Sequence, residues 1–147
     1  KDRIARADGL LLVTPEYNNG IPGVFKNAID WLSRSSPDGD ITAVFGDRAF
    51  AVIGASPGGF GTILAQNHWL PVLKTLGVRR WAGNRLMVSR AGSVFDADGA
   101  LVDPKVREQL AGFAAYSNAD ELITVHASPS LEERLTSIRL TGAGSTS

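Results

Sequence analysis

Two loops of unusual composition carry the residue types that could do chemistry. The first, Pro15 to Ile21, combines a carboxylate, a phenol and two amides, which is more polar display than a simple turn requires. The second, Ser56 to Thr62, contains three glycines, and glycine allows a ligand to approach the backbone closely. Main-chain amides at the start of a helix also favour anionic atoms. The loops therefore indicate a ligand site, although each one alone is compatible with an ordinary turn.

The glycine-rich loop also permits a different chemistry. Residues 54–58 read Gly-Ala-Ser-Pro-Gly, which fits the G-x-S-x-G pattern of a nucleophile elbow, and Asp103 and His126 follow in the order found in hydrolases. The residue after the elbow serine must donate its N–H to the oxyanion hole, and Pro57 has no N–H. The hydrolase interpretation is therefore disfavoured, and acylation of Ser56 by a fluorophosphonate probe would revive it.

Short apolar strands are expected to position these loops. The segments Gly9 to Thr14 and Ala49 to Gly54 are continuously apolar, which is typical of strands buried on both faces of a parallel sheet. Leu86 to Val88 is the third expected strand. Because ligands bind beyond the carboxyl ends of parallel strands, both loops are expected at the same edge of the sheet.

Helices are expected between the strands. The first has an apolar stripe at helical spacing and runs to about Arg34. Its apolar stripe consists of Val24, Ala28, Ile29, Trp31 and Leu32. The second starts near Thr62 and stops at Gly77, and Pro71 is expected to kink or interrupt it. Asp103 and Pro104 provide an N-cap and a first position for a third helix. This order predicts an α/β fold with a doubly wound parallel sheet in three α/β/α layers.

Composition narrows the classes of function. The 147 residues are 44% apolar, enough for one domain with a core. Fifteen basic residues balance fifteen acidic ones, so neither a nucleic acid nor a membrane surface is an expected partner. There is no cysteine, and the only histidines are His68 and His126, so no metal site is expected. No apolar run reaches the length of a membrane span or signal peptide, which favours a cytoplasmic protein.

The domain is expected to cover residues 1–126, followed by a polar tail over residues 127–147. A capping-box signal from Ser130 to Glu133 predicts a short helix in this tail. The chain opens without methionine and only three strands are counted, so we expect it to be truncated at its N-terminus.

Taken together, the two loops and their spacing resemble the NAD(P)H-dependent FMN reductase family of flavodoxin-like proteins, which includes quinone, azo-dye and chromate reductases. The motifs are P-E-Y-N-N-G-I-P-G-V-F-K-N-A-I-D-W, from Pro15 to Trp31, and G-A-S-P-G-G-F-G-T, from Gly54 to Thr62. The resemblance implies a flavodoxin-like fold, FMN as cofactor and NAD(P)H as donor. It also implies a small acceptor (a quinone, azo compound, metal ion or free flavin) and a homodimer or homotetramer.

The resemblance assigns the flavin ring to the two loops. It implies ring contacts from Pro15, Glu16, Tyr17, Asn18, Asn19 and Ile21, and from Ser56, Pro57, Gly58, Gly59, Phe60 and Gly61. Amide donors there can stabilise the negative charge that two-electron reduction leaves on the ring. No catalytic dyad is required, because the flavin carries the hydride chemistry. The alternative is a flavodoxin-like domain that serves assembly or sensing without productive flavin binding.

Family members begin with a strand and a Ser/Gly/Arg-rich loop that holds the FMN phosphate. We expect this chain to lack both, so that phosphate binding is weak and the strand Leu10 to Val13 has an unpaired edge. Trp31 and Trp69 are expected in helix-to-sheet or subunit contacts. Arg79 and Arg80 are expected in a solvated turn, with the phosphates of NADPH as the alternative partner.

Overall fold

The computed structural model describes residues 1–37, 39–83, 85–97, 100–117, 121–126 and 135–139, with side chains described as far as residue 117. In chain order the elements are α1 (Asp2–Ala5), β1 (Gly9–Val13), α2 (Gly23–Leu32), α3 (Ile41–Phe45), β2 (Ala49–Ala55), α4 (Ile63–Leu76), β3 (Arg79–Arg80), β4 (Met87–Val88), the 3-10 helix η1 (Ala91–Ser93), α5 (Pro104–Ser117), β5 (Glu121–His126) and β6 (Leu135–Arg139). The three expected strands are present as β1, β2 and β4, and the described residues add β3, β5 and β6.

The sheet has the strand order β3-β2-β1-β5-β6, with β4 paired to β2. Leu10 is in parallel register with Phe50 of β2 on one side and with Ile123 of β5 on the other. The expectation of an unpaired edge on β1 is therefore wrong, because β5 covers that edge. Strand β6 pairs with β5 in antiparallel orientation.

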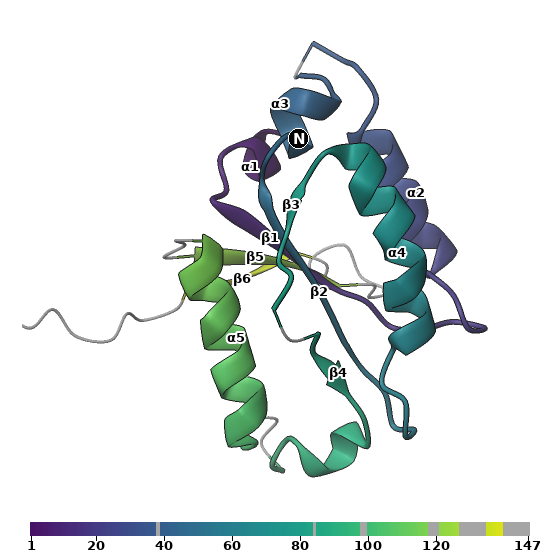
Figure 1. The fold of residues 1–147 in the computed structure, drawn as a ribbon, viewed down its shortest axis with the longest axis vertical. Coiled ribbons are helices and arrows are strands. Elements are labelled where there is room, and N and C mark those ends of the chain that lie inside the picture. The colour runs from purple at the N-terminus through teal and green to yellow at the C-terminus, as the bar shows by residue number, and fades with distance from the viewer. Residues whose placement is uncertain (38, 84, 98–99, 118–120, 127–134, 140–147) are drawn as a thin grey trace, which may run out of the picture.

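Helices cover both faces of this sheet, as Figure 1 shows, with α2 and α4 on one face and α5 on the other. The side chains of β1 alternate between these layers. Leu10 and Leu12 pack in the cluster that contains Trp69 of α4, whereas Leu11 packs with Phe113 of α5. All five side chains are almost completely buried. The structure thus confirms the three-layer α/β/α arrangement, and it confirms a helix-to-sheet role for Trp69.

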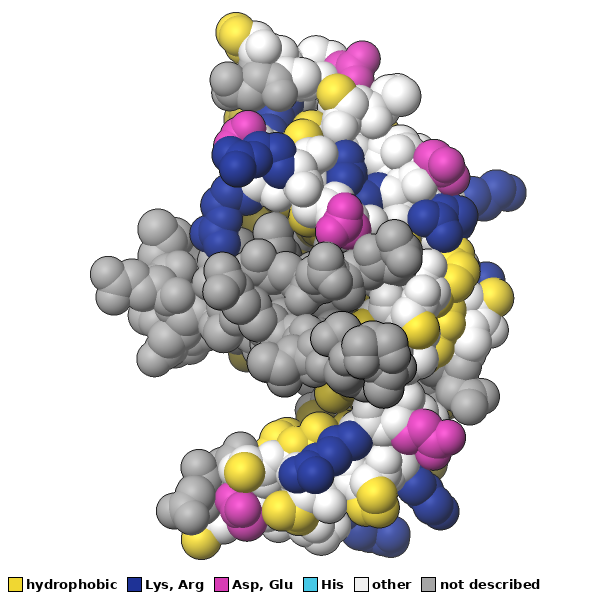
Figure 2. Space-filling model, turned by 90° about the vertical axis from the view of Figure 1, so that its left-hand side faces the viewer, with side chains coloured by type: hydrophobic (Ala, Val, Ile, Leu, Met, Phe, Trp, Pro, Cys, Tyr) yellow, Lys and Arg dark blue, Asp and Glu magenta, His cyan; other side chains and the backbone are white. Residues whose placement is uncertain are grey.

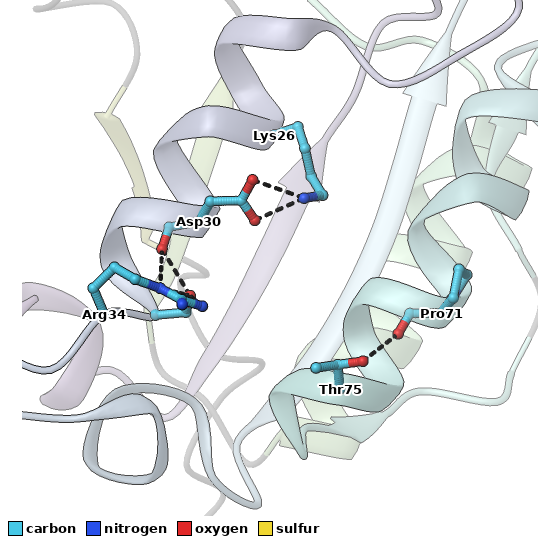
Figure 3. A network of polar contacts seen from close by, with 6 residues as sticks. Lys26, Asp30, Arg34, Pro71 and Thr75 are labelled. Atoms are coloured by element: carbon cyan, nitrogen blue, oxygen red, sulfur yellow. Dashed lines mark hydrogen bonds and ion pairs between the residues drawn. The ribbon is translucent and has the colours of Figure 1, made fainter.

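Helix α2 buries a narrower stripe than the sequence suggests. Phe25 and Ile29 face the core, but Val24 is 64% exposed and Trp31 is 69% exposed. Ala28 is exposed as well, so the expected apolar stripe is wrong at Val24, Ala28 and Trp31. Trp31 belongs to neither hydrophobic cluster of the described residues. On the outer surface Lys26 Nζ lies 2.7 Å from both carboxylate oxygens of Asp30, an i,i+4 pair shown in Figure 3.

Helix α4 continues through Pro71, so the interruption that the sequence offered as one outcome does not occur. Pro71 cannot donate to the carbonyl of Asn67 one turn earlier, but both residues are exposed, so water can reach this part of the helix. The hydroxyl of Thr75 donates to the Pro71 carbonyl at 3.1 Å (Figure 3). Gly77 ends the helix with a φ of 69°, which confirms the predicted stop.

Three further predictions concern the start of α5, the Arg79–Arg80 pair and the C-terminal segment. Asp103 Oδ1 accepts from the amides of Lys105 at 2.8 Å and Val106 at 3.1 Å, which confirms the N-cap of α5. The pair Arg79–Arg80 forms β3 and not a turn. The helix expected at residues 130–133 lies outside the described residues, and the following residues, Leu135–Arg139, form β6.

Acidic and basic side chains are interspersed over the described part of the face shown in Figure 2. Among the described residues no helix is long and apolar enough to cross a bilayer.

Candidate functional site

The two sequence-predicted loops leave neighbouring strands at the same edge of the sheet. Val13 is in register with Ile53, and the amide of Thr14 extends the ladder to the Ile53 carbonyl at 2.8 Å. The first loop connects β1 to α2 and the second connects β2 to α4; both extend towards the lower right of Figure 1. The structure therefore brings together the two segments that the sequence singled out.

The first loop contains a tight turn that projects from the sheet. The amide of Tyr17 donates to the carbonyl of Gly20 at 3.1 Å, and the reverse bond is 3.0 Å. Between them Asn18 and Asn19 have φ values of 50° and 62°. Two successive left-handed residues define a type I′ turn, and asparagine tolerates this conformation better than other non-glycine residues. The turn presents the Tyr17 side chain, which is 58% exposed.

The residues that flank this turn hold it in place. Pro15 is half-buried, and its carbonyl accepts from the hydroxyl of Thr14 at 2.9 Å. Ile21 is half-buried against the main core. Glu16 directs one carboxylate oxygen, Oε2, to the amides of Leu64 at 2.9 Å and Ala65 at 3.0 Å in the first turn of α4. Two of the residues predicted to contact the ring therefore have other partners: Ile21 packs against the core and Glu16 binds the start of α4.

Glycine is required at two positions around the second loop, namely Gly54 near the end of β2 and Gly61 within the loop. A Cβ on Gly54 would lie 1.9 Å from Thr62 Oγ1 and 2.4 Å from the Thr14 carbonyl oxygen. Gly61 has a φ of 60°, and a Cβ there would lie 2.9 Å from the carbonyl carbon of Met87. Glycine is therefore required at both positions, because the strand end, the start of α4 and β4 approach one another closely.

The middle of the second loop faces open space. A Cβ on Gly59 would meet no atom within 4 Å, and one on Gly58 would touch only Ser56 Oγ at 4.0 Å. Pro57 is exposed, and Phe60 is 83% exposed. Accessible main chain at Gly58 and Gly59, together with the exposed rings of Tyr17 and Phe60, fits a flat aromatic ligand such as a flavin ring, because such a ligand can stack on rings and bond to backbone amides.

Sequence reasoning missed Arg90, which the fold brings to the glycine loop. Its amide donates to the carbonyl of Gly58 at 2.9 Å, and the amide of Ala91 donates to the carbonyl of Ser56 at 3.0 Å. Arg90 has a φ of 49° and an exposed side chain that makes no ion pair with any described residue. Backbone conformations of this kind cluster at functional sites. The local sequence carries no signal for it beyond a charged residue soon after a strand.

Comparison with known proteins assigns the chain to a family. The sequence model of the NADPH-dependent FMN reductase family matches residues 1–93. The chain belongs to this family. It is 44% identical over 108 residues to an NAD(P)H-dependent FMN reductase of Pseudomonas aeruginosa, covering 74% of this chain and 56% of that protein. It is 42% identical over 113 residues to a 2-hydroxy-1,4-benzoquinone reductase of a Burkholderia species, covering 77% and 60%.

A solved member of similar fold is FerB, an NAD(P)H:(acceptor) oxidoreductase flavoenzyme from Paracoccus denitrificans. It matches with a TM-score of 0.66 and 30% identity, over 92% of this chain and 66% of FerB. The FMN reductase family and the flavodoxin-like fold expected from the sequence are thus confirmed. The chain spans under two thirds of the two relatives described above.

The family assignment also removes the hydrolase alternative. The hydroxyl of Ser56 has the carbonyl oxygen of Gly58 as its partner, at 3.5 Å, and Pro57 follows it in the chain. The loop therefore lacks the amide donor that an elbow serine needs, and no base among the described residues is bonded to Ser56. Asp103, the acidic residue of that alternative, caps α5, and the side chain of His126 lies outside the described residues.

Proposed function

We propose that this protein is an FMN-dependent oxidoreductase that passes hydride from NAD(P)H, through the flavin, to a small acceptor such as a quinone. The observation that carries the proposal is the juxtaposition of the Tyr17–Gly20 turn with the open glycine loop at the carboxyl ends of β1 and β2. Relatives named for FMN and quinone reduction support the assignment.

The proposed roles follow from what each loop can offer. FMN, when bound, supplies the hydride chemistry. The chain supplies main-chain donors and aromatic surface: the backbone of Gly58 and Gly59 is accessible, and the rings of Tyr17 and Phe60 are exposed. Donors fixed in a folded loop stabilise negative charge on a ligand without the cost of reorientation. Pro15, Asn19, Ser56, Pro57 and Gly61 shape the two loops and complete the proposed ring site together with Asn18.

Two assays test this proposal. The purified protein should be yellow, retain FMN and oxidise NAD(P)H when a quinone is added. Steady-state rates should give parallel double-reciprocal lines, because donor and acceptor take turns over one flavin. Intersecting lines would count against alternate occupancy. A colourless protein whose spectrum does not change when FMN is added would instead favour the non-catalytic assembly or sensing role.

We further infer that the protein forms a homodimer or homotetramer through α2. Val24 and Trp31 are seven residues apart on this helix, so they lie on one face, and both are largely exposed. An exposed apolar patch of this kind marks an interaction surface. Sedimentation velocity should show an oligomer for the wild type and a smaller species for Trp31→Glu. Arg34→Glu, just beyond the C-terminal end of α2, is the control. A monomeric wild type would contradict the inference.

A cytoplasmic location belongs to the same proposal, because reduced nicotinamide nucleotides are supplied there. Fractionation of cells that produce the tagged protein tests it.

A further inference from the structure

The start of α4 has no cap from its own neighbourhood. Thr62 occupies the N-cap position but its side chain makes no capping hydrogen bond. The amides that an N-cap side chain normally satisfies are those of the second and third helical residues, here Leu64 and Ala65. Glu16 Oε2 accepts from both, at 2.9 and 3.0 Å, although Glu16 lies 48 and 49 residues earlier in the chain. A residue of the first loop thus caps the helix that follows the second loop.

Helix α4 is itself bonded to the segment that precedes β4 through one buried and one exposed polar side chain. The side-chain amide of Gln66 donates to Thr62 Oγ1 at 3.1 Å and to the carbonyl oxygen of Leu86 at 3.0 Å. Arg85 donates to Asn67 Oδ1 at 2.8 Å from the segment before β4. The amides that Glu16 binds therefore belong to a helix whose place relative to β4 and to the glycine loop is set independently of Glu16.

The Tyr17–Gly20 turn is bonded to this helix through the residue before it and lies close to the helix at its other end. Glu16 directly precedes the turn and binds the first turn of α4. At the other end, a Cβ on Gly20 would lie 3.5 Å from His68 Nδ1, one helical turn further along α4. The turn therefore has little freedom to move relative to α4 while the Glu16 carboxylate remains bound.

The negative charge of Glu16 favours its contact with the N-terminus of α4. A carboxylate facing the flavin would repel the negative charge that reduction places on the ring. The N-terminus of a helix instead carries partial positive charge and unsatisfied N–H groups, so it stabilises a carboxylate. This placement removes an anion from the ring site and uses it to join the two loops.

We propose that Glu16 is a positioning residue, which locks the turn of the first loop to α4 and so sets its distance from the glycine loop, and is not a ring contact. The effect on flavin binding rests on the proposed function, but the contact of Glu16 with α4 can be tested without flavin. Glu16→Ala removes both hydrogen bonds. Glu16→Gln keeps an oxygen acceptor but removes the charge, so it should rescue part of the effect.

The first measurement is the rate of amide hydrogen exchange in the flavin-free protein, which NMR detects residue by residue. Glu16→Ala should accelerate exchange at Leu64 and Ala65 by about tenfold or more, the factor that corresponds to loss of a typical helix cap. Glu16→Gln should give a smaller acceleration. Asp40→Ala is the matched control, because Asp40 Oδ1 caps α3 through Thr42 and Ala43 at 2.9 Å each and lies in a different loop. It should accelerate exchange in α3 and leave α4 unchanged.

The second measurement is flavin affinity and midpoint potential in the same variants. Glu16→Ala should weaken FMN and riboflavin by the same factor, about tenfold, whereas Asp40→Ala should weaken neither. Glu16→Gln should leave the midpoint potential at the wild-type value. A clear rise in that variant would identify a carboxylate that touches the ring and would overturn the proposal.

Two further outcomes would also overturn it. In one, Glu16→Ala weakens flavin binding while Leu64 and Ala65 keep their wild-type exchange rates. In the other, exchange accelerates but flavin affinity is unchanged, so that the lock exists without positioning the site. A wild-type protein with no flavin affinity would overturn the proposed function and the positioning role together, while the exchange rates would still decide whether the lock exists.

Discussion

The indole N–H of Trp69 lies 3.4 Å from Oγ1 of Thr14, so the centre of α4 is bonded to the residue at which β1 ends and the first loop begins. Both side chains are almost fully buried. Thr14→Val keeps the shape but leaves the indole N–H without a partner, and we expect it to lower the free energy of unfolding by about 1 to 2 kcal/mol. Urea denaturation measures this. Thr75→Val, at an exposed position of α4, should change stability by less than about 0.5 kcal/mol, and equal losses in the two variants would contradict the prediction.

The glycines of the second loop are expected to differ sharply in their tolerance of alanine. Gly54→Ala places a Cβ against the Thr14 carbonyl oxygen and Thr62 Oγ1, and the backbone oxygen cannot move aside cheaply. We expect a loss of about 3 kcal/mol or more. Gly59→Ala projects into open space and should change stability by less than about 0.5 kcal/mol. Thermal unfolding of both variants compares them, and similar melting temperatures would show that the loop packs differently.

Gly59 should nevertheless be sensitive to a larger side chain when flavin binds. Gly59→Val should leave the fold intact, because none of the described residues fills the space beside its α-carbon. It should weaken flavin affinity by blocking the approach of the ring to the backbone. Fluorescence titration with FMN measures the effect. Wild-type affinity in this variant would show that the ring lies elsewhere.

Asn18 distinguishes backbone from side-chain contributions at the tip of the first loop. Because its φ is 50°, Asn18→Gly should keep the turn and bind flavin within about threefold of the wild type. Asn18→Val forces a β-branched residue into the left-handed region at a cost of about 1 to 2 kcal/mol, which corresponds to roughly tenfold in affinity. If glycine loses as much affinity as valine, the Asn18 amide itself bonds to the ring.

The chain should discriminate weakly between FMN and riboflavin. On the described loops at the ring site Arg90 is the one basic side chain, and Glu16 is occupied by α4. Each charge-assisted bond to phosphate contributes about 1.5 to 3 kcal/mol, so a single arginine limits the preference for FMN to roughly 100-fold. Arg90→Gln should remove most of what preference exists, whereas Arg80→Gln on β3 should not. Titration of each variant with both flavins checks this, and a larger preference that survives Arg90→Gln would require a phosphate site elsewhere.

Local sequence was sufficient for much of this fold. The continuous apolar runs of β1 and β2 are buried as predicted, since a parallel sheet covered on both faces leaves no polar side. Gly77 ends α4 in a left-handed conformation that its lack of a Cβ permits, and Asp103 caps α5 through its own carboxylate. The type I′ turn is also consistent with the Asn-Asn-Gly sequence after Tyr17.

Features set by distant residues were not accessible in the same way. The apolar periodicity of α2 includes Trp31, and only the tertiary structure shows that nothing in the described chain covers it. The Glu16 contact joins segments 48 residues apart, so no local pattern contains it. Thr62 is a residue type that commonly caps a helix, and only the structure shows that its side chain does not cap α4. The sequence signal was limited to an acidic residue soon after the neighbouring strand.

The pairing of β1 with β5 joins a strand near the start of the sequence to one more than a hundred residues later. Leu10 and Ile123 lie more than a hundred residues apart, whereas Leu10 and Phe50 are separated by only 40. Contacts of long sequence separation are slow to form, because a large loop must close before they contribute stability. The ribosome synthesises β1, β2 and the loop that follows each of them well before it synthesises β5. Among the described residues, this side of β1 has no partner until β5 has been synthesised, and an unpaired strand edge can pair with another chain.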